Sequence, residues 1–472
     1  MSIKQVMNPK SFLTYSLGCR TNQAEIETIS LQLTDCSLRQ ITRNEIPDIV
    51  LLNTCVVTQK AEKETRQKIR ELRTKYPNAL LVILGCAVTA KEKLKILLPE
   101  ADLLIPNEQK GRTIKIIEQK IYSNKQMIHC NFENKYILSG RKFIKIQDGC
   151  SGGCSFCLTQ FVRGKPTSAP PEKIIEEINF WIEKGIKEII LTGINIGLYN
   201  PTDRYTDRYH TCHITDLLNK ILSETKVERI SFSSIDPEIL LSAKGSVPSF
   251  INNSRISQYF HLSLQSGSSS VLKRMNRETD LKELLTKLGR IKKQNPFFSF
   301  RADIIVGFPN ETEKEFQETL DFIKKTKISF VHIFPFSPRK GTIAYEMIKS
   351  KKWNEVPKEI KRERVGKIRK VVEETRNNEA KKMTGLKQNC LIVRSLSRYI
   401  VEGISENGWP VLVKSSKACP EQVEGLKVKS YKGKILPVRI TGFEGNYLLG
   451  EITSLPTSSR KTSGTSIEPS AF

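Results

Sequence analysis

The 472-residue sequence lacks long apolar runs, and its five histidines are few beside eleven cysteines. No apolar run approaches the roughly 18 residues of a membrane-spanning helix, and the first residues lack the apolar segment of a signal peptide. We therefore expect a cytoplasmic protein with no membrane partner. In that compartment the cysteines are better explained as metal ligands and buried thiols than as disulfides.

Acidic residues are scarce relative to basic ones. Asp and Glu number 50 against 76 Lys and Arg, which gives a net charge of +26. This excess favours a polyanionic partner, with nucleic acid first and an anionic membrane second. A lysine-rich proteome would produce the same excess, so composition leaves that alternative open.

Three cysteines stand close together in residues 148–157, with the spacing C-x3-C-x2-C. The loop follows an apolar, strand-like stretch at 143–146. A [4Fe-4S] cluster held by Cys150, Cys154 and Cys157 would keep one iron open for a substrate or cofactor. A zinc knuckle or a disulfide is the alternative, but zinc needs a fourth ligand and no histidine lies close in sequence. The spacing therefore predicts an iron–sulfur cluster.

A second group of three cysteines is spread over residues 12–120, where apolar strands alternate with helical stretches. We expect strands at 12–17, 48–52 and 80–84, and helices at 23–33, 59–74 and 89–98, with weaker structure to 121. Cys19, Cys55 and Cys86 each lie just past the carboxyl end of a strand. In an open parallel sheet those ends share one edge, whereas ordinary buried thiols would show no common position. We therefore expect a second cluster, again one ligand short of four.

From residue 142 to about 344 the chain again alternates strands and helices. Strands are expected near 143–147, 187–192, 227–233, 259–264, 298–306 and 328–335, with helices between them that include 171–184 and 311–325. Six such units predict a partial (β/α)6 barrel whose active face lies at the carboxyl ends of its strands.

Three polar or glycine-rich stretches follow barrel strands, at 191–197, 264–268 and 304–309. Their glycines leave backbone groups free to meet a small ligand, although plain strand-to-helix turns are the alternative. His261 and His332 lie inside apolar strands, so we expect them to be core histidines rather than ligands.

The predicted fold class is α/β, with an open parallel α/β domain, a partial barrel and a small carboxyl-terminal β-barrel. Residues 346–382 form a helical connector that packs on the barrel and turns its basic residues outward. Residues 414–425 interrupt the strand pattern of the last barrel and are interpreted as an inserted loop. The expected divisions are 10–122, 142–345, 346–382, 383–453 and a disordered Ser/Thr/Pro-rich tail at 454–472, with a polar connector at 122–141.

The loop around Cys150, with a strand before it and a helix after it, resembles the signature of the radical S-adenosylmethionine (SAM) enzymes. Residues 16–23, 53–58 and 85–87 resemble the amino-terminal domain of the methylthiotransferases, and 438–451 resembles the RNA-binding TRAM barrel. The resemblance spans almost the whole chain. It implies two [4Fe-4S] clusters, an auxiliary one at the first three cysteines and one that binds SAM at the second three.

The resemblance also implies a reaction. In that family one SAM methylates a sulfur held at the auxiliary cluster, and a second SAM yields a 5′-deoxyadenosyl radical that removes hydrogen from the acceptor carbon. A reductant such as flavodoxin or ferredoxin and a sulfur donor are then needed. The residues expected to bind SAM are Thr192, Gly193, Asn195, Gln265 and Gly307.

The residues at 147–150, 191–197 and 261–267 most resemble the corresponding motifs of the branch that acts on N6-threonylcarbamoyladenosine in the anticodon stem-loop of tRNA. Three alternatives stay open: the branch acting on N6-isopentenyladenosine, the branch acting on an aspartate of a ribosomal protein, and a non-catalytic iron–sulfur RNA-binding protein. A threonylcarbamoyl group carries a carboxylate and a hydroxyl, which a buried site would meet with cationic side chains. Arg163 and Arg301 are the candidates, unless each pairs with an acidic neighbour.

Overall fold

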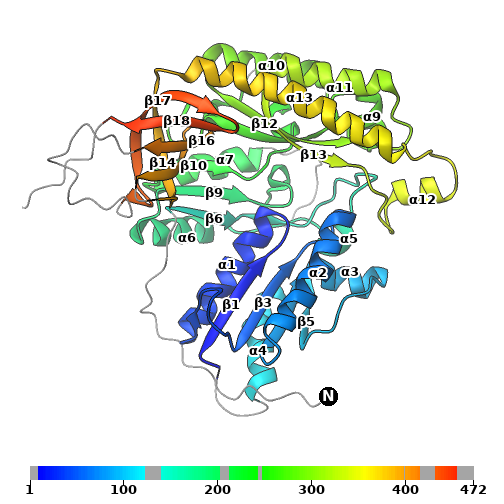
Figure 1. Ribbon diagram of the computed structural model, residues 1–472, viewed down its shortest axis with the longest axis vertical. Coiled ribbons are helices and arrows are strands. Elements are labelled where there is room, and N and C mark those ends of the chain that lie inside the picture. The colour runs from blue at the N-terminus through cyan, green and yellow to red at the C-terminus, as the bar shows by residue number, and fades with distance from the viewer. Residues whose placement is uncertain are drawn as a thin grey trace, which may run out of the picture.

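The computed structural model describes residues 9–122, 140–201, 212–242, 247–397, 399–414 and 431–453. These residues form an open parallel sheet with helices, a larger unit of six parallel strands with helices, and a small closed β-barrel (Figure 1). The predicted fold class is confirmed. Within the described residues, every helix is too short or too polar to cross a membrane.

The amino-terminal unit is a five-stranded parallel sheet in the order β2-β1-β3-β4-β5. Its strands are β1 (Ser11–Ser16), β2 (Arg39–Gln40), β3 (Ile49–Thr54), β4 (Leu80–Gly85) and β5 (Leu103–Ile105), and its helices are α1 (Arg20–Asp35), α2 (Gln59–Lys75), α3 (Cys86–Leu94), η1 (Asn107–Arg112) and α4 (Thr113–Tyr122). β3 and β4 are buried along their whole length, as expected for apolar strands covered on both faces. Because β1, β3 and β4 are neighbours, their carboxyl ends form one edge.

The second unit holds two three-stranded parallel sheets, β10-β9-β6 and β11-β12-β13. The strands are β6 (Arg141–Lys145), β9 (Glu188–Thr192), β10 (Arg229–Phe232), β11 (Tyr259–Gln265), β12 (Ser299–Val306) and β13 (Ile328–Pro335). Two parallel bridges, Ile230 with Ile256 and Ile235 with Leu262, join the sheets into a row of six. No pairing links β6 to β13 in the part of the chain that the structure describes, so the barrel is open on one side.

Helices cover the outside of this barrel, and short elements connect its strands (Figure 1). They are β7 (Gln147–Asp148), α5 (Thr159–Arg163), β8 (Thr167–Ser168), α6 (Pro171–Glu183), η2 (Ile196–Leu198), α7 (Cys212–Glu224), α8 (Glu238–Leu241), η3 (Ser249–Asn252), α9 (Ser269–Arg274), α10 (Leu281–Gln294), α11 (Glu313–Thr326), α12 (Ile343–Lys349) and α13 (Lys358–Met383).

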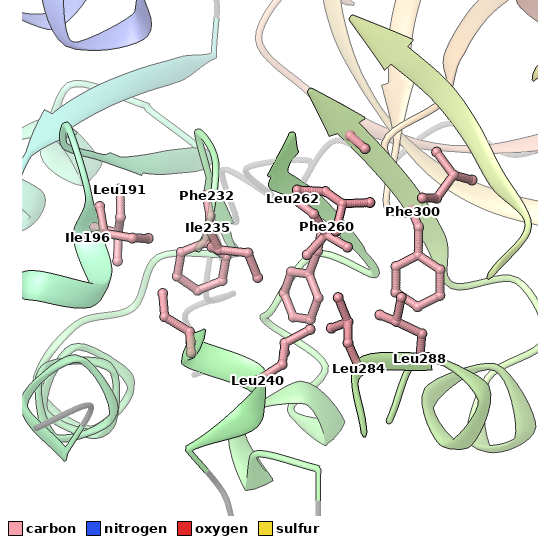
Figure 2. Packing of buried hydrophobic residues seen from close by; sticks show 14 of the residues in the cluster. Leu191, Ile196, Phe232, Ile235, Leu240, Phe260, Leu262, Leu284, Leu288 and Phe300 are labelled. Carbon is pink, nitrogen blue, oxygen red and sulfur yellow. The ribbon is translucent and has the colours of Figure 1, made fainter. Parts of the chain in front are cut away.

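Along β11, side chains that pack into the core alternate with side chains that face the barrel interior. Phe260, Leu262 and Leu264 are fully buried, whereas the residues between them are only partly buried. Figure 2 shows Phe260 beside Leu284 of α10, and Phe300 of β12 beside Leu288. Successive side chains of a strand point to opposite faces, so the partly buried residues of β11 line the barrel interior.

Helix α13 lies along the barrel, as Figure 1 shows, but its basic residues are not all outward. Arg364 is buried and pairs with Glu311 at 2.6 Å. Lys361 is also buried and donates to the carbonyl of Phe336 at 3.0 Å. The expectation of an outward basic face is wrong at these two positions, because Glu311 pairs with Arg364 and Glu355 pairs with Lys361.

The carboxyl-terminal barrel closes in the order β14-β15-β16-β18-β17. Its strands are β14 (Lys387–Ser395), β15 (Ile400–Ser405), β16 (Pro410–Lys414), β17 (Ile435–Glu444) and β18 (Tyr447–Ile452). It contacts the larger barrel through Arg229, which donates to the carbonyls of Asn389 and Ile404 at 2.8 and 3.1 Å. The expected tail, almost all of the expected inserted loop and most of the polar connector lie outside the described residues.

Candidate active site

Cys150, Cys154 and Cys157 follow the first barrel strand and line one open cavity. The loop depends on glycine at its start. Gly149 has φ +68°, and a Cβ there would lie 2.0 Å from the carbonyl oxygen of Lys165. The loop can therefore turn sharply only with glycine at this position.

All three sulfurs of the cluster loop meet N–H donors. The contacts are Gly152 N to Cys150 Sγ at 3.3 Å, Thr159 N to Cys157 Sγ at 3.3 Å, and Arg277 Nη1 to Cys154 Sγ at 3.6 Å. Such donors stabilise thiolate ligands and cluster sulfides. Burial raises the pKa of the Cys150 thiol to about 11, and a bound metal would favour its thiolate. The donor set and the cavity fit a [4Fe-4S] cluster.

The segment expected to bind the amino group of SAM is packed against the cluster loop. Asn195 donates its backbone N–H to Oε1 of Gln147 at 2.9 Å. Gly193 approaches the same residue so closely that a Cβ would lie 2.9 Å from this oxygen. Thr192 is buried at the end of β9, and its hydroxyl has no partner among the described residues. Contact of these three residues with SAM stays a prediction.

The other two residues expected to bind SAM also lie at the carboxyl ends of strands. Gln265 ends β11 with φ +71°, and Gly307 follows β12 with φ +68°. Gly307 donates its N–H to Glu311 at 2.6 Å, and a Cβ on it would lie 2.4 Å from Cγ of Lys361. The structure thus gives Gly307 a packing role, and its contact with SAM stays a prediction.

The structure brings Cys19, Cys55 and Cys86 to one edge of the amino-terminal sheet. Cys19 is exposed at the N-cap of α1, and the other two are buried just after β3 and β4. A Cβ on Gly18 would lie 2.7 Å from the sulfur of Cys55. Burial first, and then the charges of Cys86 and Cys19, raise the pKa of Cys55 to about 12. The three sulfurs are therefore grouped, and their binding of a cluster stays a prediction.

Arg163, expected to bind substrate, lies in a buried ion network between the two groups of cysteines. Its side chain is 2% exposed and donates from Nη1 to Glu25 at 2.9 Å and to Asp148 at 2.8 Å. Burial raises the pKa of Glu25, but Arg163, Lys110 and Lys145 outweigh burial and hold it well below its usual range. These contacts assign Arg163 to the joint between the domains, and its contact with substrate stays a prediction.

Arg301 lies between the two barrels. Its guanidinium donates to the carbonyl of Gly408 and stacks over the rings of Tyr259 and Phe330, 5.1 and 4.6 Å from their centroids. Burial lowers its pKa. Unlike Arg163, it has no carboxylate partner among the described residues. Its expected role in binding substrate stays a prediction.

The expectation that both histidines are core residues is wrong for His332, whereas His261 is 12% exposed and its Nε2 is satisfied by Asp303. Both contact Asp303 from the barrel interior, and the side chain of His332 is 68% exposed. The signal was present in the sequence, because His261 shares its strand face with Ser263 and Gln265 rather than with the apolar residues between them. Sequence reasoning also missed Asp303, the residue that joins the two.

Two protein families match the sequence. Residues 144–323 match the radical SAM superfamily, and residues 11–106 match the uncharacterized protein family UPF0004. The first range holds the cluster loop and the larger barrel up to α11, and the second holds Cys19, Cys55 and Cys86.

Curated relatives extend over most of the chain. The threonylcarbamoyladenosine tRNA methylthiotransferase MtaB of Chlamydia pneumoniae is 34% identical over 392 residues, which cover 81% of this chain and 86% of that protein. The tRNA-2-methylthio-N(6)-dimethylallyladenosine synthase of Clostridium botulinum (strain Loch Maree / Type A3) is 29% identical over 472 residues, 95% of this chain and 100% of that protein. Among solved structures, the radical SAM methyltransferase TsrM of Kitasatospora setae has a TM-score of 0.50 at 10% identity, covering 72% of this chain and 76% of that chain. At this identity the likeness concerns the fold alone.

Proposed function

Because the chain belongs to the methylthiotransferases of the radical SAM superfamily, we propose that it converts N6-threonylcarbamoyladenosine of tRNA to its 2-methylthio derivative. As a member of that superfamily it binds SAM and a [4Fe-4S] cluster. The threonylcarbamoyl branch is favoured by the relatives, which reach 34% identity in that branch and 29% in the dimethylallyl branch.

One observation carries the proposal: two groups of three cysteines lie on either side of Arg163, which follows the cluster loop and interacts electrostatically with Cys86 and Cys19. Cys150, Cys154 and Cys157 would hold the cluster that binds SAM, and the sulfurs of the amino-terminal edge would hold an auxiliary cluster. When bound, the first cluster with SAM supplies a carbon-centred radical, and the auxiliary cluster holds the sulfur that is transferred.

The chain's own residues position these groups. Arg277 is the cation beside Cys154, and it is itself held by Asp236 at 2.8 Å. Gln147 anchors the backbone of Asn195 next to the cluster loop. Helix α1 packs against β6, so the exposed Cys19 lies at the open side of the barrel, where substrate must enter.

We further propose that the substrate is the anticodon stem-loop of a tRNA and that the carboxyl-terminal barrel holds its phosphates. Lys387 and Arg439 are paired neighbours on β14 and β17, and both are exposed. A flavodoxin- or ferredoxin-like reductant, a separate sulfur donor and a cytoplasmic location belong to the same proposal. So does the division into domains at 10–122, 142–345, 346–382 and 383–453.

The test is mass spectrometry of nucleosides in tRNA from cells that lack this protein, complemented with the wild type or with Cys150→Ala. Loss of the 2-methylthio-threonylcarbamoyl nucleoside, restored only by the wild type, supports the proposal. Loss in the isopentenyl series instead would assign the chain to the dimethylallyl branch. No change in either nucleoside would favour a protein substrate or a non-catalytic role.

A further inference from the structure

Three polar side chains meet on the wall of the barrel interior, outside both groups of cysteines. Nε2 of His261 lies 2.9 Å from Oδ1 of Asp303, and Nδ1 of His332 lies 3.1 Å from the same oxygen. The two imidazole rings are 4.8 Å apart. Asp303 and His332 are register partners on β12 and β13, so strand pairing itself builds the contact. We call this group the His-Asp-His site.

The carboxylate fixes how the two histidines present their nitrogens. Burial raises the pKa of Asp303, but its hydrogen bonds to both histidines outweigh burial and lower it to about 2. An ionised carboxylate only accepts hydrogen bonds, so each imidazole must turn an N–H toward it. Nε2 of His332 and Nδ1 of His261 therefore remain for other partners.

His332 is the accessible member of the site. Its side chain is 68% exposed, against 23% for Asp303 and 12% for His261. It lies on β13, the strand at the open side of the barrel. Within the described ranges Nε2 of His332 has no hydrogen-bond partner, so a ligand in the interior can reach it.

The charged side chains near the His-Asp-His site favour an anionic ligand. Arg301 lies two residues before Asp303 on β12, on the same face. Burial first, and then the charges of Arg141 and Arg20, lower the pKa of Arg301. Arg141 is paired with Glu188, whereas Arg20 extends over the ring of Phe143 at 5.3 Å. Neither Arg301 nor Arg20 has a carboxylate partner among the described residues. A negatively charged ligand stabilises cations that disfavour each other's charge.

We propose that the His-Asp-His site receives the threonylcarbamoyl group of the substrate, with Nε2 of His332 as its hydrogen-bond partner. A neutral imidazole accepts from the hydroxyl of that group, and a protonated one donates to its carboxylate. An isopentenyl group offers neither contact. The inference rests on the proposed function, and it makes His332 a specificity-determining residue.

The alternative occupant is a divalent cation. The three ligand atoms lie within 4.8 Å of one another, and two imidazoles with one carboxylate suit several transition metals. A metal at these three atoms would have to displace both N–H hydrogen bonds to Asp303. The threonylcarbamoyl group would instead bind Nε2 of His332, which those hydrogen bonds do not use. The observed hydrogen bonds therefore favour the organic ligand.

The experiment measures binding of anticodon stem-loop RNAs that carry threonylcarbamoyladenosine, isopentenyladenosine or unmodified adenosine at one position. Cluster-loaded wild type, His332→Phe and His332→Gln are compared by fluorescence anisotropy. His332→Phe keeps a ring beside His261 and Phe334 but removes the hydrogen bond. We expect it to lose about tenfold of the preference for the threonylcarbamoyl RNA, the usual size of a hydrogen bond to a charged group. His332→Gln should recover part of the preference.

Iron content and SAM cleavage without RNA serve as folding controls and should match the wild type in both variants. An unchanged preference in His332→Phe, while the wild type still makes the methylthio-threonylcarbamoyl nucleoside, would overturn this inference alone. A wild type that acts on isopentenyladenosine would overturn the proposed substrate as well. Stoichiometric zinc or manganese that is lost in His332→Phe, without a change in RNA preference, would show a metal site instead.

Discussion

Arg163 of α5 donates to Glu25 of α1 across 2.9 Å, and only 2% of its side chain is exposed. Arg163 closes the segment that begins with the cluster loop, and Glu25 follows Cys19 by less than two helical turns. This ion pair therefore joins the two groups of cysteines. Burying the charges costs desolvation free energy, which their partners must offset, so the pair constrains the domains to one arrangement.

Replacement of Arg163 by Met should destabilise the protein, because it removes one partner of a buried carboxylate. We expect a loss of about 3 kcal/mol in the free energy of unfolding, the typical cost of breaking a buried pair. Urea unfolding measures it. In a double-mutant cycle, Arg163→Met with Glu25→Gln should cost less than the sum of the single changes. Lys60→Met, at an exposed pair 3.7 Å long, is the control and should change little.

Acid should weaken the same joint. The pKa of Glu25 is held well below its usual range by Arg163 and two lysines, against the effect of burial. A carboxyl whose folded pKa is lowered contributes stability above its unfolded pKa of about 4.3 and loses it as pH falls through the folded value. The stability difference between the wild type and Glu25→Gln should thus be full at pH 7 and shrink below about pH 4. A difference independent of pH would contradict this assignment.

The cysteine groups should be separable by iron analysis. We expect about eight irons in the anaerobically reconstituted wild type and about four after either triple replacement by Ala. Loss of Cys150, Cys154 and Cys157 should abolish SAM cleavage. Loss of the three amino-terminal cysteines should spare cleavage but stop methylthiolation. A triple variant that keeps full iron content would remove its cysteines from the ligand set.

RNA binding should depend on salt through the exposed basic pair of the carboxyl-terminal barrel. The double change Lys387→Gln and Arg439→Gln should lower the slope of log affinity against log salt by about 0.7 to 0.9 for each phosphate that is no longer neutralised. SAM cleavage without RNA should be unaffected. The matched control is the double change Lys60→Gln and Lys68→Gln on α2, which removes the same amount of charge. Equal slopes for the two double variants would place the RNA elsewhere.

Sequence patterning predicted the six barrel strands, and the three strands that precede Cys19, Cys55 and Cys86, to within two residues at every end. Long apolar strands between glycine-rich turns leave few alternatives. In the carboxyl-terminal barrel the sequence predicts strands at 390–393, 411–413, 435–440 and 447–452 but misses β15 (Ile400–Ser405), which contains both Glu402 and Gly403. It also misses β5 (Leu103–Ile105), which has only three residues. Short strands depend on pairing with neighbours more than on their own composition.

The contacts of the charged residues in the site were harder to predict from the sequence. Sequence placed Arg163 near the cluster loop, but its partners Glu25 and Asp148 lie 138 and 15 residues away. Only the docking of α1 on the barrel decides that such a residue is buried and paired. His332 was misplaced for a related reason, since its pairing with Asp303 depends on the register between β12 and β13.

The last prediction concerns the segment expected to bind SAM. Gly193 packs on Gln147 so tightly that a Cβ would lie 2.9 to 3.0 Å from three of its atoms, which is closer than side chains normally approach. Gly193→Ala should therefore push the segment away from the cluster loop and raise the KM for SAM about tenfold, with little effect on iron content. Gly289→Ala on α10 is the matched control, since a Cβ there meets no atom within 4 Å and Ala favours a helix. SAM cleavage kinetics without RNA compare the two. Equal KM values would mean that the close contact with Gln147 does not position SAM.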